Sequence, residues 1–358
     1  MAVYISKSGC PLFKWLLMQL SVYNKSLIVK LMEEFRHYDM LFPELVYDIL
    51  DYFRGGNSIK PFSEKCISDY CERSRFNSQM PKGEIIQPDV VYRICETLAA
   101  KRVVTKIGSK LGLEEISSNY YYSPGNVSYF LQKTPSLLFL LNCKVYGFRY
   151  IYNAYKQMVL PVVVKKDGKI SMGTCFKLHH GIVTAKHCLE TDEVAIGGYS
   201  AEKLSQCKVM ISTDSEIDLA YIETNEHSLL LSGEAKVLDE VLVMGYPKIP
   251  MFFDFCTAER AAISSIPTRG AVAALVDQYI SRNIGKLMLV TARIRGGNSG
   301  GPIIDSDGAV VGVAFCEPQS EGDYDEMGYG IAYPIHVLNA LLQDNVPLKV
   351  NFVDKVEV

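Results

Sequence analysis

The 358-residue sequence lacks an apolar run long enough to cross a membrane. Its two apolar stretches, 11–20 and 137–141, are short, and Lys14 and Gln19 interrupt the first. The first stretch also has no convincing small-residue cleavage site, so it predicts a buried helix rather than a signal peptide. We therefore expect neither a targeting segment nor a membrane contact.

Metal and nucleotide motifs are missing as well. The ten cysteines contain no pair at metal-ligand spacing to a second pair, which argues against zinc, and there is no phosphate-binding glycine loop. We therefore expect a protein that works without a cofactor. The net charge of −3, with 48 % hydrophobic and 22 % charged residues, is typical of an ordinary globular protein, and the length predicts two domains.

What the sequence does contain is one hydroxyl group between glycines, in the stretch Gly-Gly-Asn-Ser-Gly-Gly-Pro at 296–302. A nucleophilic serine must project from a tight turn, with backbone N–H groups aimed at the developing oxyanion. A side chain at Gly297 or Gly300 would block the substrate or forbid the turn. The alternative is a glycine-rich hairpin without chemistry, so the decision rests on whether a base and an acid lie upstream.

Both are found upstream of Ser299. His187 follows the apolar residues 181–183, so it lies just past the end of a strand, where a general base is held rigidly and still reaches the serine. Asp218 opens an apolar strand and is the favoured orienting acid, whereas Asp214 lies in the polar lead-in and is better explained as a turn residue. Five other histidines lack such a setting: His37, His179, His180, His227 and His336.

The three motifs are Thr-Ala-Lys-His-Cys at 184–188, Asp-Leu-Ala at 218–220 and Gly-Asn-Ser-Gly-Gly-Pro at 297–302. In this order they resemble the chymotrypsin-like (trypsin-fold) serine proteases over roughly residues 157–345. The resemblance implies two packed six-stranded β-barrels with Ser299 as nucleophile, His187 as general base and then acid, and Asp218 as its orienter. It also implies an oxyanion hole made by the N–H groups of Gly297 and Ser299. By the same resemblance, Arg293, six residues before the nucleophile, would lie near the base of the specificity pocket and select acidic substrates, unless it faces solvent or an internal carboxylate.

Departures from the family pattern indicate which branch of the family the sequence resembles. Asn298 replaces the aspartate that captures a new N-terminus in digestive members, and no Ile-Val-Gly-Gly begins the domain, so activation by such insertion is not expected. The segments 173–176, 245–247 and 330–334 are similar to the high-temperature-requirement and glutamyl endopeptidase branches. Too few residues follow position 345 for the peptide-binding domain that is usual in the first of these branches.

The cysteine positions favour a reducing cytoplasm over a secreted, disulfide-bonded enzyme. Secreted relatives usually bridge the cysteine after the catalytic histidine to a position that is here Met172, so Cys188 has no expected partner. Most other cysteines lie in apolar segments, as buried free thiols do.

The first 150 residues predict helices near 12–23, 26–38, 42–54, 62–73 and 88–101, from apolar spacings of three and four. Strand-like residues follow at 102–108 and at the tyrosine run 120–122. Three helices followed by a two-stranded hairpin resemble a winged-helix module over roughly 41–123. Residues 124–156 are expected to form a helical connector.

Charge differs between the two halves of the chain. Residues 1–150 hold 19 basic and 14 acidic residues, against 18 and 26 in the remainder. A mildly basic half permits nucleic-acid binding without requiring it. We expect instead an activating protein partner, with nucleic acid as the alternative.

The second half has the strand rhythm of a double barrel, with strands expected at 159–164, 237–244, 286–292 and 309–316. The predicted domains are a mainly α regulatory domain (1–123), the connector (124–156), the protease (157–345) and a tail (346–358). The predicted function is that of an intracellular serine endopeptidase acting on protein or peptide substrates. The alternative is a non-catalytic peptide-binding protein that keeps the protease shell.

Overall fold

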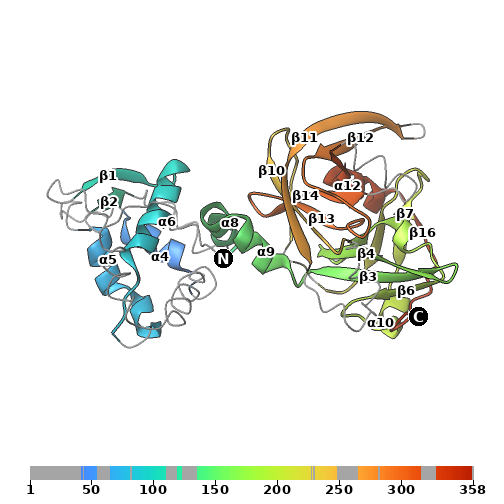
Figure 1. Cartoon of the computed structure of the whole chain (residues 1–358), viewed down its shortest axis with the longest axis horizontal. Helices are drawn as coiled ribbons and strands as arrows, with labels where there is room; N and C mark the ends of the chain where they lie inside the picture. The colour runs from blue at the N-terminus through green and yellow to red at the C-terminus, as the bar shows by residue number, and fades with distance from the viewer. Residues whose placement is uncertain are drawn as a thin grey trace, which may run out of the picture. The chain divides into compact units, whose positions relative to one another are not determined.

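The computed structural model describes residues 42, 44–54, 65–80, 83–109, 119–122, 135–226, 228, 230–247, 265–280, 283–315 and 328–356. The helices expected at 12–23 and 26–38 lie outside these residues. The chain divides into two compact units, Met1–Val145 and Tyr146–Val358. Each is described by itself (Figure 1).

The first unit is a helical cluster followed by a β-hairpin. Its described elements are α4 (Leu45–Tyr52), α5 (Ile67–Arg73), the 3-10 helix η3 (Arg75–Gln79), α6 (Pro88–Ala100), β1 (Thr105–Ser109) and β2 (Asn119–Tyr122), and α8 (Pro135–Tyr146) ends at the unit boundary. Helix α5 begins later than the apolar spacing predicts, because Cys66 has extended backbone. The order of three helices and an antiparallel hairpin is the one expected for a winged-helix module, and that identification remains a prediction.

Helix α6 shows how the sequence builds this unit. Pro88 occupies the first turn, where a missing N–H costs nothing, and Val91, Ile94, Cys95 and Leu98 line one buried face at helical spacing. The hairpin is attached to this helix, because the buried Tyr121 donates a hydrogen bond from its hydroxyl to the Glu96 carboxylate at 2.7 Å. The tyrosine run therefore contributes its central member to the core.

The second unit consists of helix α9 (Phe148–Tyr155) and two β-sheets. The strands of the first sheet are β3 (Val159–Lys166), β4 (Lys169–Leu178), β5 (Gly181–Thr184), β6 (Glu193–Ile196), β7 (Val209–Ser212), β8 (Ala220–Glu223) and β16 (Asn345–Pro347), arranged in the order β16-β7-β8-β5-β4-β3-β6. The short helices η6 (Lys186–Cys188) and α10 (Ala201–Ser205) lie between strands. We call this sheet with its enclosed core the first barrel.

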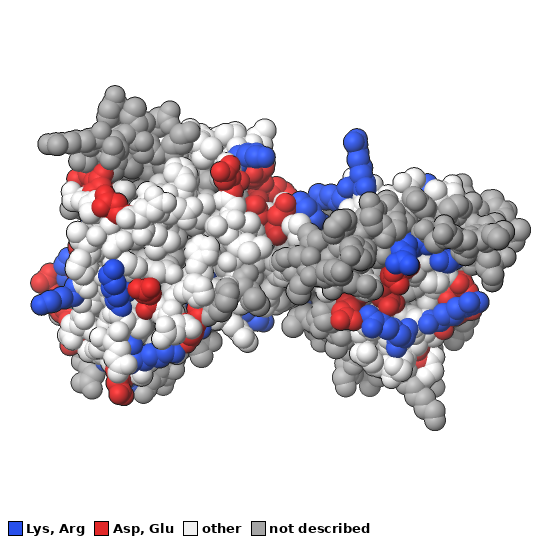
Figure 2. All heavy atoms as spheres, turned by 180° about the vertical axis from the view of Figure 1, so that it is seen from behind, with Lys and Arg blue, Asp and Glu red and all other residues white. Residues whose placement is uncertain are grey.

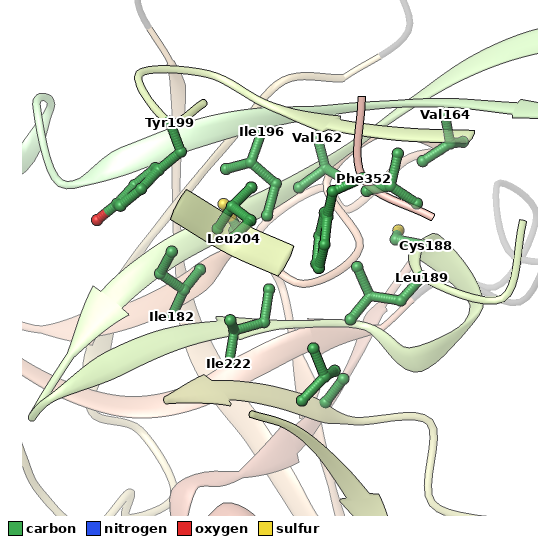
Figure 3. Packing of buried hydrophobic residues seen from close by; sticks show 14 of the residues in the cluster. Val162, Val164, Ile182, Cys188, Leu189, Ile196, Tyr199, Leu204, Ile222 and Phe352 are labelled. Atoms are coloured by element: carbon green, nitrogen blue, oxygen red, sulfur yellow. The ribbon is translucent and has the colours of Figure 1, made fainter. Parts of the chain in front are cut away.

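The C-terminal segment pairs with both edges of the first barrel. Strand β16 pairs with β7, and farther along the chain Val353 N–H donates to the Val194 carbonyl of β6 at 2.9 Å. Phe352 bridges Val194 of β6 and packs beside Cys188 and Leu189 (Figure 3). The residues expected as a tail, 346–358, are therefore part of the barrel wall in this structure up to residue 356.

The second sheet closes on itself as the second barrel. Its strands are β9 (Leu231–Ser232), β10 (Glu240–Gly245), β11 (Ile266–Ile280), β12 (Asn283–Val290), β13 (Pro302–Asp305), β14 (Ala309–Phe315) and β15 (Gly330–Pro334), and the pairing of β13 with β14 closes six of them into a ring. Helix α12 (Ile335–Gln343) follows β15. The predicted mainly α half followed by a chymotrypsin-type double barrel is thus the fold that is observed.

Two further features bear on the sequence predictions. Strand β10 begins at Glu240 rather than 237, because Leu238 adopts φ 74° in a turn before it.

The described cysteines are free thiols: Cys66, Cys71, Cys95, Cys143, Cys175, Cys188 and Cys207. In the part of the chain that the structure describes, no helix combines the length and apolar character needed to cross a membrane.

Candidate active site

His187 lies where strand β5 ends. The four residues of β5 are all buried, and the chain then turns through η6, in which Cys188 N–H donates to the Ala185 carbonyl at 3.2 Å. Cys188 is anchored in the first-barrel core, whereas the His187 side chain keeps 32 % of its surface exposed. The histidine is therefore held by a rigid element with its ring at the surface, as the sequence predicts.

Asp218 lies beside His187 because strands β5 and β8 are antiparallel. Thr184 at the end of β5 pairs with Ala220 at the start of β8, so the residues just beyond each strand meet. Asp218 Oδ1 accepts from the backbone N–H of His187 at 2.8 Å, and Oδ2 lies 2.5 Å from the His187 ring atom Nδ1. Two contacts fix the carboxylate against the Nδ1 side of the imidazole.

This pairing changes the titration of the ring. Burial lowers the pKa of His187, but the Asp218 hydrogen bond, the neighbouring Cys188 and the Asp218 charge together raise that pKa above its ordinary value of 6.5. A base of raised pKa binds its proton more firmly. The same pair therefore favours proton transfer to His187 and keeps the imidazolium beside a carboxylate.

Asp214, the alternative acid, binds residues that follow it directly in the chain. Its Oδ1 accepts from the N–H of Glu216 at 3.0 Å, and its backbone carbonyl accepts from the N–H of Ile217 at 3.2 Å. These contacts are those of a turn residue. The structure thus brings Asp218, rather than Asp214, to the ring of His187.

The loop that carries Ser299 has the backbone that its glycines suggest. Gly297 and Gly300 have φ of +96° and +83°, which side chains of L-residues adopt rarely. A Cβ atom on Gly300 would lie 2.3 Å from the Thr174 carbonyl and 2.6 Å from the Ala185 nitrogen. The loop is therefore pressed against the first barrel, within two residues of His187 along the chain.

Ser299 itself is 3 % exposed, and its carbonyl accepts from the N–H of Thr174 at 2.9 Å. Beside it, the N–H of Gly297 donates to no acceptor among the described residues. The loop thus places a buried serine beside a backbone N–H group, an arrangement that the predicted oxyanion hole requires. His187 and Asp218 come from the first barrel and Ser299 from the second, which explains their separation in sequence.

Arg293 is placed differently from a buried pocket cation. Its side chain is exposed, and its backbone carbonyl accepts from the Thr268 hydroxyl at 3.1 Å. Of the two predictions made for this residue, the structure favours the solvent-facing one. Selection of acidic substrates by Arg293 remains a hypothesis without a buried charge to carry it.

Tyr333 is a residue near the site that the sequence reasoning used only as a family marker. Its hydroxyl accepts from the N–H of Asp218 at 3.3 Å and donates to the Glu216 carbonyl at 3.3 Å. Tyr333 belongs to β15, so the second barrel touches the acid loop of the first. No signal in the sequence points to this contact, because it joins positions more than a hundred residues apart.

Known proteins match the same part of the chain. Residues 172–313 match the family model described as a trypsin-like peptidase domain. Over 183 residues the chain is 28 % identical to Protease Do-like 2, chloroplastic, of Arabidopsis thaliana, covering 49 % of this chain and 28 % of that protein. Over 195 residues it is 26 % identical to the magnetosome formation protease MamE of Paramagnetospirillum magneticum, covering 52 % and 23 %. The chain thus spans about a quarter of the length of these relatives.

Two solved structures are similar to part of the chain. The HtrA-type protease AlgW with a tripeptide covers 55 % of this chain and 62 % of its own, at 19 % identity and a TM-score of 0.42. The Rv3671c protease from M. tuberculosis, active form, covers 57 % and 89 %, at 18 % identity and a TM-score of 0.41. The segment that matches the trypsin-like peptidase domain model, residues 172–313, includes His187, Asp218 and Ser299.

Proposed function

We propose that this chain is a serine endopeptidase that cleaves protein or peptide substrates through an acyl-enzyme. The observation that carries the proposal is the two-point contact between Asp218 and His187 beside the Ser299 loop. The match to a family model supports the class of chemistry, and this contact supports His187 and Asp218 as two of the residues that carry it.

The reaction assigns one role to each residue. Ser299 Oγ attacks the scissile carbonyl carbon while His187 Nε2 takes the hydroxyl proton, and the N–H groups of Gly297 and Ser299 stabilise the oxyanion. His187 then returns the proton to the leaving amine, and the acyl-enzyme forms. A water molecule, deprotonated by His187, attacks this ester, and collapse of the second tetrahedral intermediate releases the acid and restores Ser299. Asp218 holds the imidazole in the required tautomer throughout.

The decisive experiment is labelling of the full chain with a fluorophosphonate probe, which bonds covalently to an activated serine. The full chain should be labelled, and Ser299→Ala and His187→Ala should each abolish labelling, because the members of the site act as a unit. Absence of labelling in the well-folded full chain would favour the non-catalytic peptide-binding alternative.

The N-terminal unit is proposed to control the protease through an activating protein partner. Its compactness supports an independent recognition role. The mixed charges of α6 favour a protein over a nucleic acid as the partner. The exposed or half-buried positions of α6 include Asp89 and Glu96, and Arg93 forms an ion pair with Asp89. On the face shown in Figure 2, basic and acidic side chains are interspersed rather than gathered in one basic patch.

A reducing cytoplasm is the proposed location, and free thiols support it. Cys175 and Cys188 are both buried in the first-barrel core and unbridged. Activity should therefore be the same with and without dithiothreitol. A large loss of activity on reduction would reject this location.

A further inference from the structure

The Ser299 loop is held in place by one residue of the other barrel. We infer that Thr174, on strand β4 of the first barrel, is a positioning residue that sets the conformation of the oxyanion loop 296–299. The inference deepens the proposed function, since it concerns the donors of the same site.

Thr174 is fully buried, and both its backbone and its hydroxyl are hydrogen-bonded. Its N–H donates to the Ser299 carbonyl at 2.9 Å, and its hydroxyl donates to the Gly297 carbonyl at 2.6 Å. The same hydroxyl accepts from the N–H of Tyr246 at 3.0 Å, and its carbonyl accepts from the Thr184 hydroxyl at 2.8 Å. The residue thus contacts the loop on both sides of Asn298.

The hydroxyl of Thr174 has only one way to satisfy these neighbours. A threonine hydroxyl carries a single proton. Because the Tyr246 N–H already donates to the oxygen, that proton goes to the Gly297 carbonyl. The polarity of the contact is therefore fixed, and a side chain without a hydroxyl would leave a donor and an acceptor unpaired in the interior.

Peptide planarity carries this constraint to the oxyanion donors. In a trans peptide the carbonyl and the N–H point in opposite directions. In the peptide that follows Gly297, Thr174 binds the carbonyl and the Asn298 N–H donates to the Arg295 carbonyl at 2.9 Å. In the peptide that follows Ser299, Thr174 binds the carbonyl and the Gly300 N–H donates to the Ala314 carbonyl at 2.9 Å. The Ser299 N–H belongs to the peptide between these two, whose Asn298 carbonyl accepts from the N–H of Gly301 at 2.9 Å. Thr174 holds the peptide planes on either side of it, so a rotation that would redirect the Ser299 N–H is opposed from both sides.

The loop needs such an anchor because it is not relaxed by itself. Asn298 is buried, and its side-chain oxygen Oδ1 has no hydrogen-bond partner among the described residues. Gly297 also has φ of +96°. A loop that keeps an unpaired buried oxygen favours rearrangement once the hydroxyl bond from Thr174 to the Gly297 carbonyl is removed.

The test uses the full chain with Thr174→Val, which removes the hydroxyl at nearly constant shape, and Thr174→Ser, which restores it. Thr224→Val is the matched control, since Thr224 is also buried and donates from its hydroxyl to a backbone carbonyl, that of His180, at 3.2 Å. Hydrolysis of p-nitrophenyl acetate gives kcat and KM. Exchange of backbone amides over 296–301, followed by mass spectrometry, reports the loop itself.

Thr174→Val should lower kcat by at least about tenfold, with KM changed little, because a misplaced oxyanion donor weakens only the transition state. Thr174→Ser should keep most of the wild-type kcat, and Thr224→Val all of it. Amide exchange over 296–301 should rise in Thr174→Val alone. If both kcat and exchange in Thr174→Val match those of Thr224→Val, the inference is overturned. If the wild type shows no turnover, the proposed function fails, and the exchange measurement still decides the role of Thr174.

Discussion

At the scale of single residues, the contacts of Asp218 and Asp214 distinguish the two candidates for the acid. Asp218 contacts both the backbone and the ring of His187, whereas Asp214 binds the N–H of Glu216. Asp218→Asn should lower kcat by roughly 10³- to 10⁴-fold, because the amide favours the wrong tautomer of His187. Asp214→Asn keeps an acceptor oxygen for its turn and should stay near wild-type activity. Steady-state hydrolysis of one ester substrate checks both variants, and the opposite order of effects would transfer the role to Asp214.

The raised pKa of His187 predicts how activity depends on pH. The reaction requires neutral His187, so the rate should rise with pH through the pKa of this residue and be lost below it. The midpoint of this acidic limb should lie above 6.5. The contribution of His187 to the stability of the folded state depends on pH in the opposite sense. Because its pKa is higher in the folded than in the unfolded chain, the stabilisation is complete below the unfolded-state pKa of 6.5. It is lost as the pH rises through the folded-state pKa.

A profile of kcat/KM against pH in the full chain measures this limb. The pKa of His187 in the Ser299→Ala chain, measured by nuclear magnetic resonance of the ring, gives an independent value. A midpoint below 6.5 in both measurements would contradict the contribution assigned to Asp218.

At the scale of elements, the two barrels hold parts of each other's site. Thr174 of the first barrel binds the Ser299 loop of the second, and Tyr333 of the second binds the Asp218 loop of the first. Tyr333→Phe removes the hydroxyl that joins the Asp218 N–H to the Glu216 carbonyl. We expect kcat to fall roughly three- to tenfold, the size of one lost hydrogen bond, and the acidic limb to move to lower pH as the His187 pair loosens.

Tyr155→Phe is the matched control for this prediction. Tyr155 is also buried, and its hydroxyl donates to the Gly308 carbonyl at 2.9 Å, away from the acid loop. Both variants should lose similar thermal stability, but only Tyr333→Phe should change kcat and the pH profile. Equal kinetics in the two variants would reduce Tyr333 to a packing residue.

The C-terminal segment supplies a second prediction at this scale. Phe352 is 8 % exposed and packs in the first-barrel core with Cys188 and Leu189, directly after His187 (Figure 3). Phe352→Ala should destabilise the protease unit by about 3–5 kcal/mol, through lost burial and the remaining cavity. Val356→Ala, in a smaller cluster with Val163 and Ala195, should cost less. Denaturant unfolding measures both, and a larger loss for Val356→Ala would refute the role given to Phe352.

The elements also explain what the sequence could predict. Strand spacing, glycine placement and the apolar residues before His187 are local features. The double barrel and the positions of the candidate site residues could therefore be predicted from them. The wall role of 346–356 depends on two unpaired strand edges meeting in space, which no local pattern encodes. The contacts of Thr174 and Tyr333 are also non-local. The exposure of Arg293 depends on how its loop leaves β12, which its family position alone does not encode.

At the scale of the whole molecule, the second compact unit begins before its first strand, β3. Helix α9 belongs to the same compact unit, and its Tyr152 donates from the hydroxyl to the Ser265 carbonyl at 2.9 Å. Tyr155 does the same to Gly308 at 2.9 Å. A chain shortened to 146–358 therefore keeps these contacts, whereas a chain starting at the strand β3 loses both. This sets where the N-terminal unit is removed in a test of its role.

The last prediction is that the N-terminal unit controls access to the active conformation. An effector changes an activity only through different affinities for two states of the protease, and the N-terminal unit is the segment large enough to recognise one. We expect residues 146–358 alone to hydrolyse a small ester faster than the full chain, or to ignore a cell-extract activator to which the full chain responds. Rates and fluorophosphonate labelling are compared with and without extract, and nuclease-treated extract separates a protein activator from a nucleic acid. Ser299→Ala in both lengths corrects for hydrolysis that does not come from this site. Equal rates and equal labelling of both lengths in every condition would leave the N-terminal unit without a controlling role.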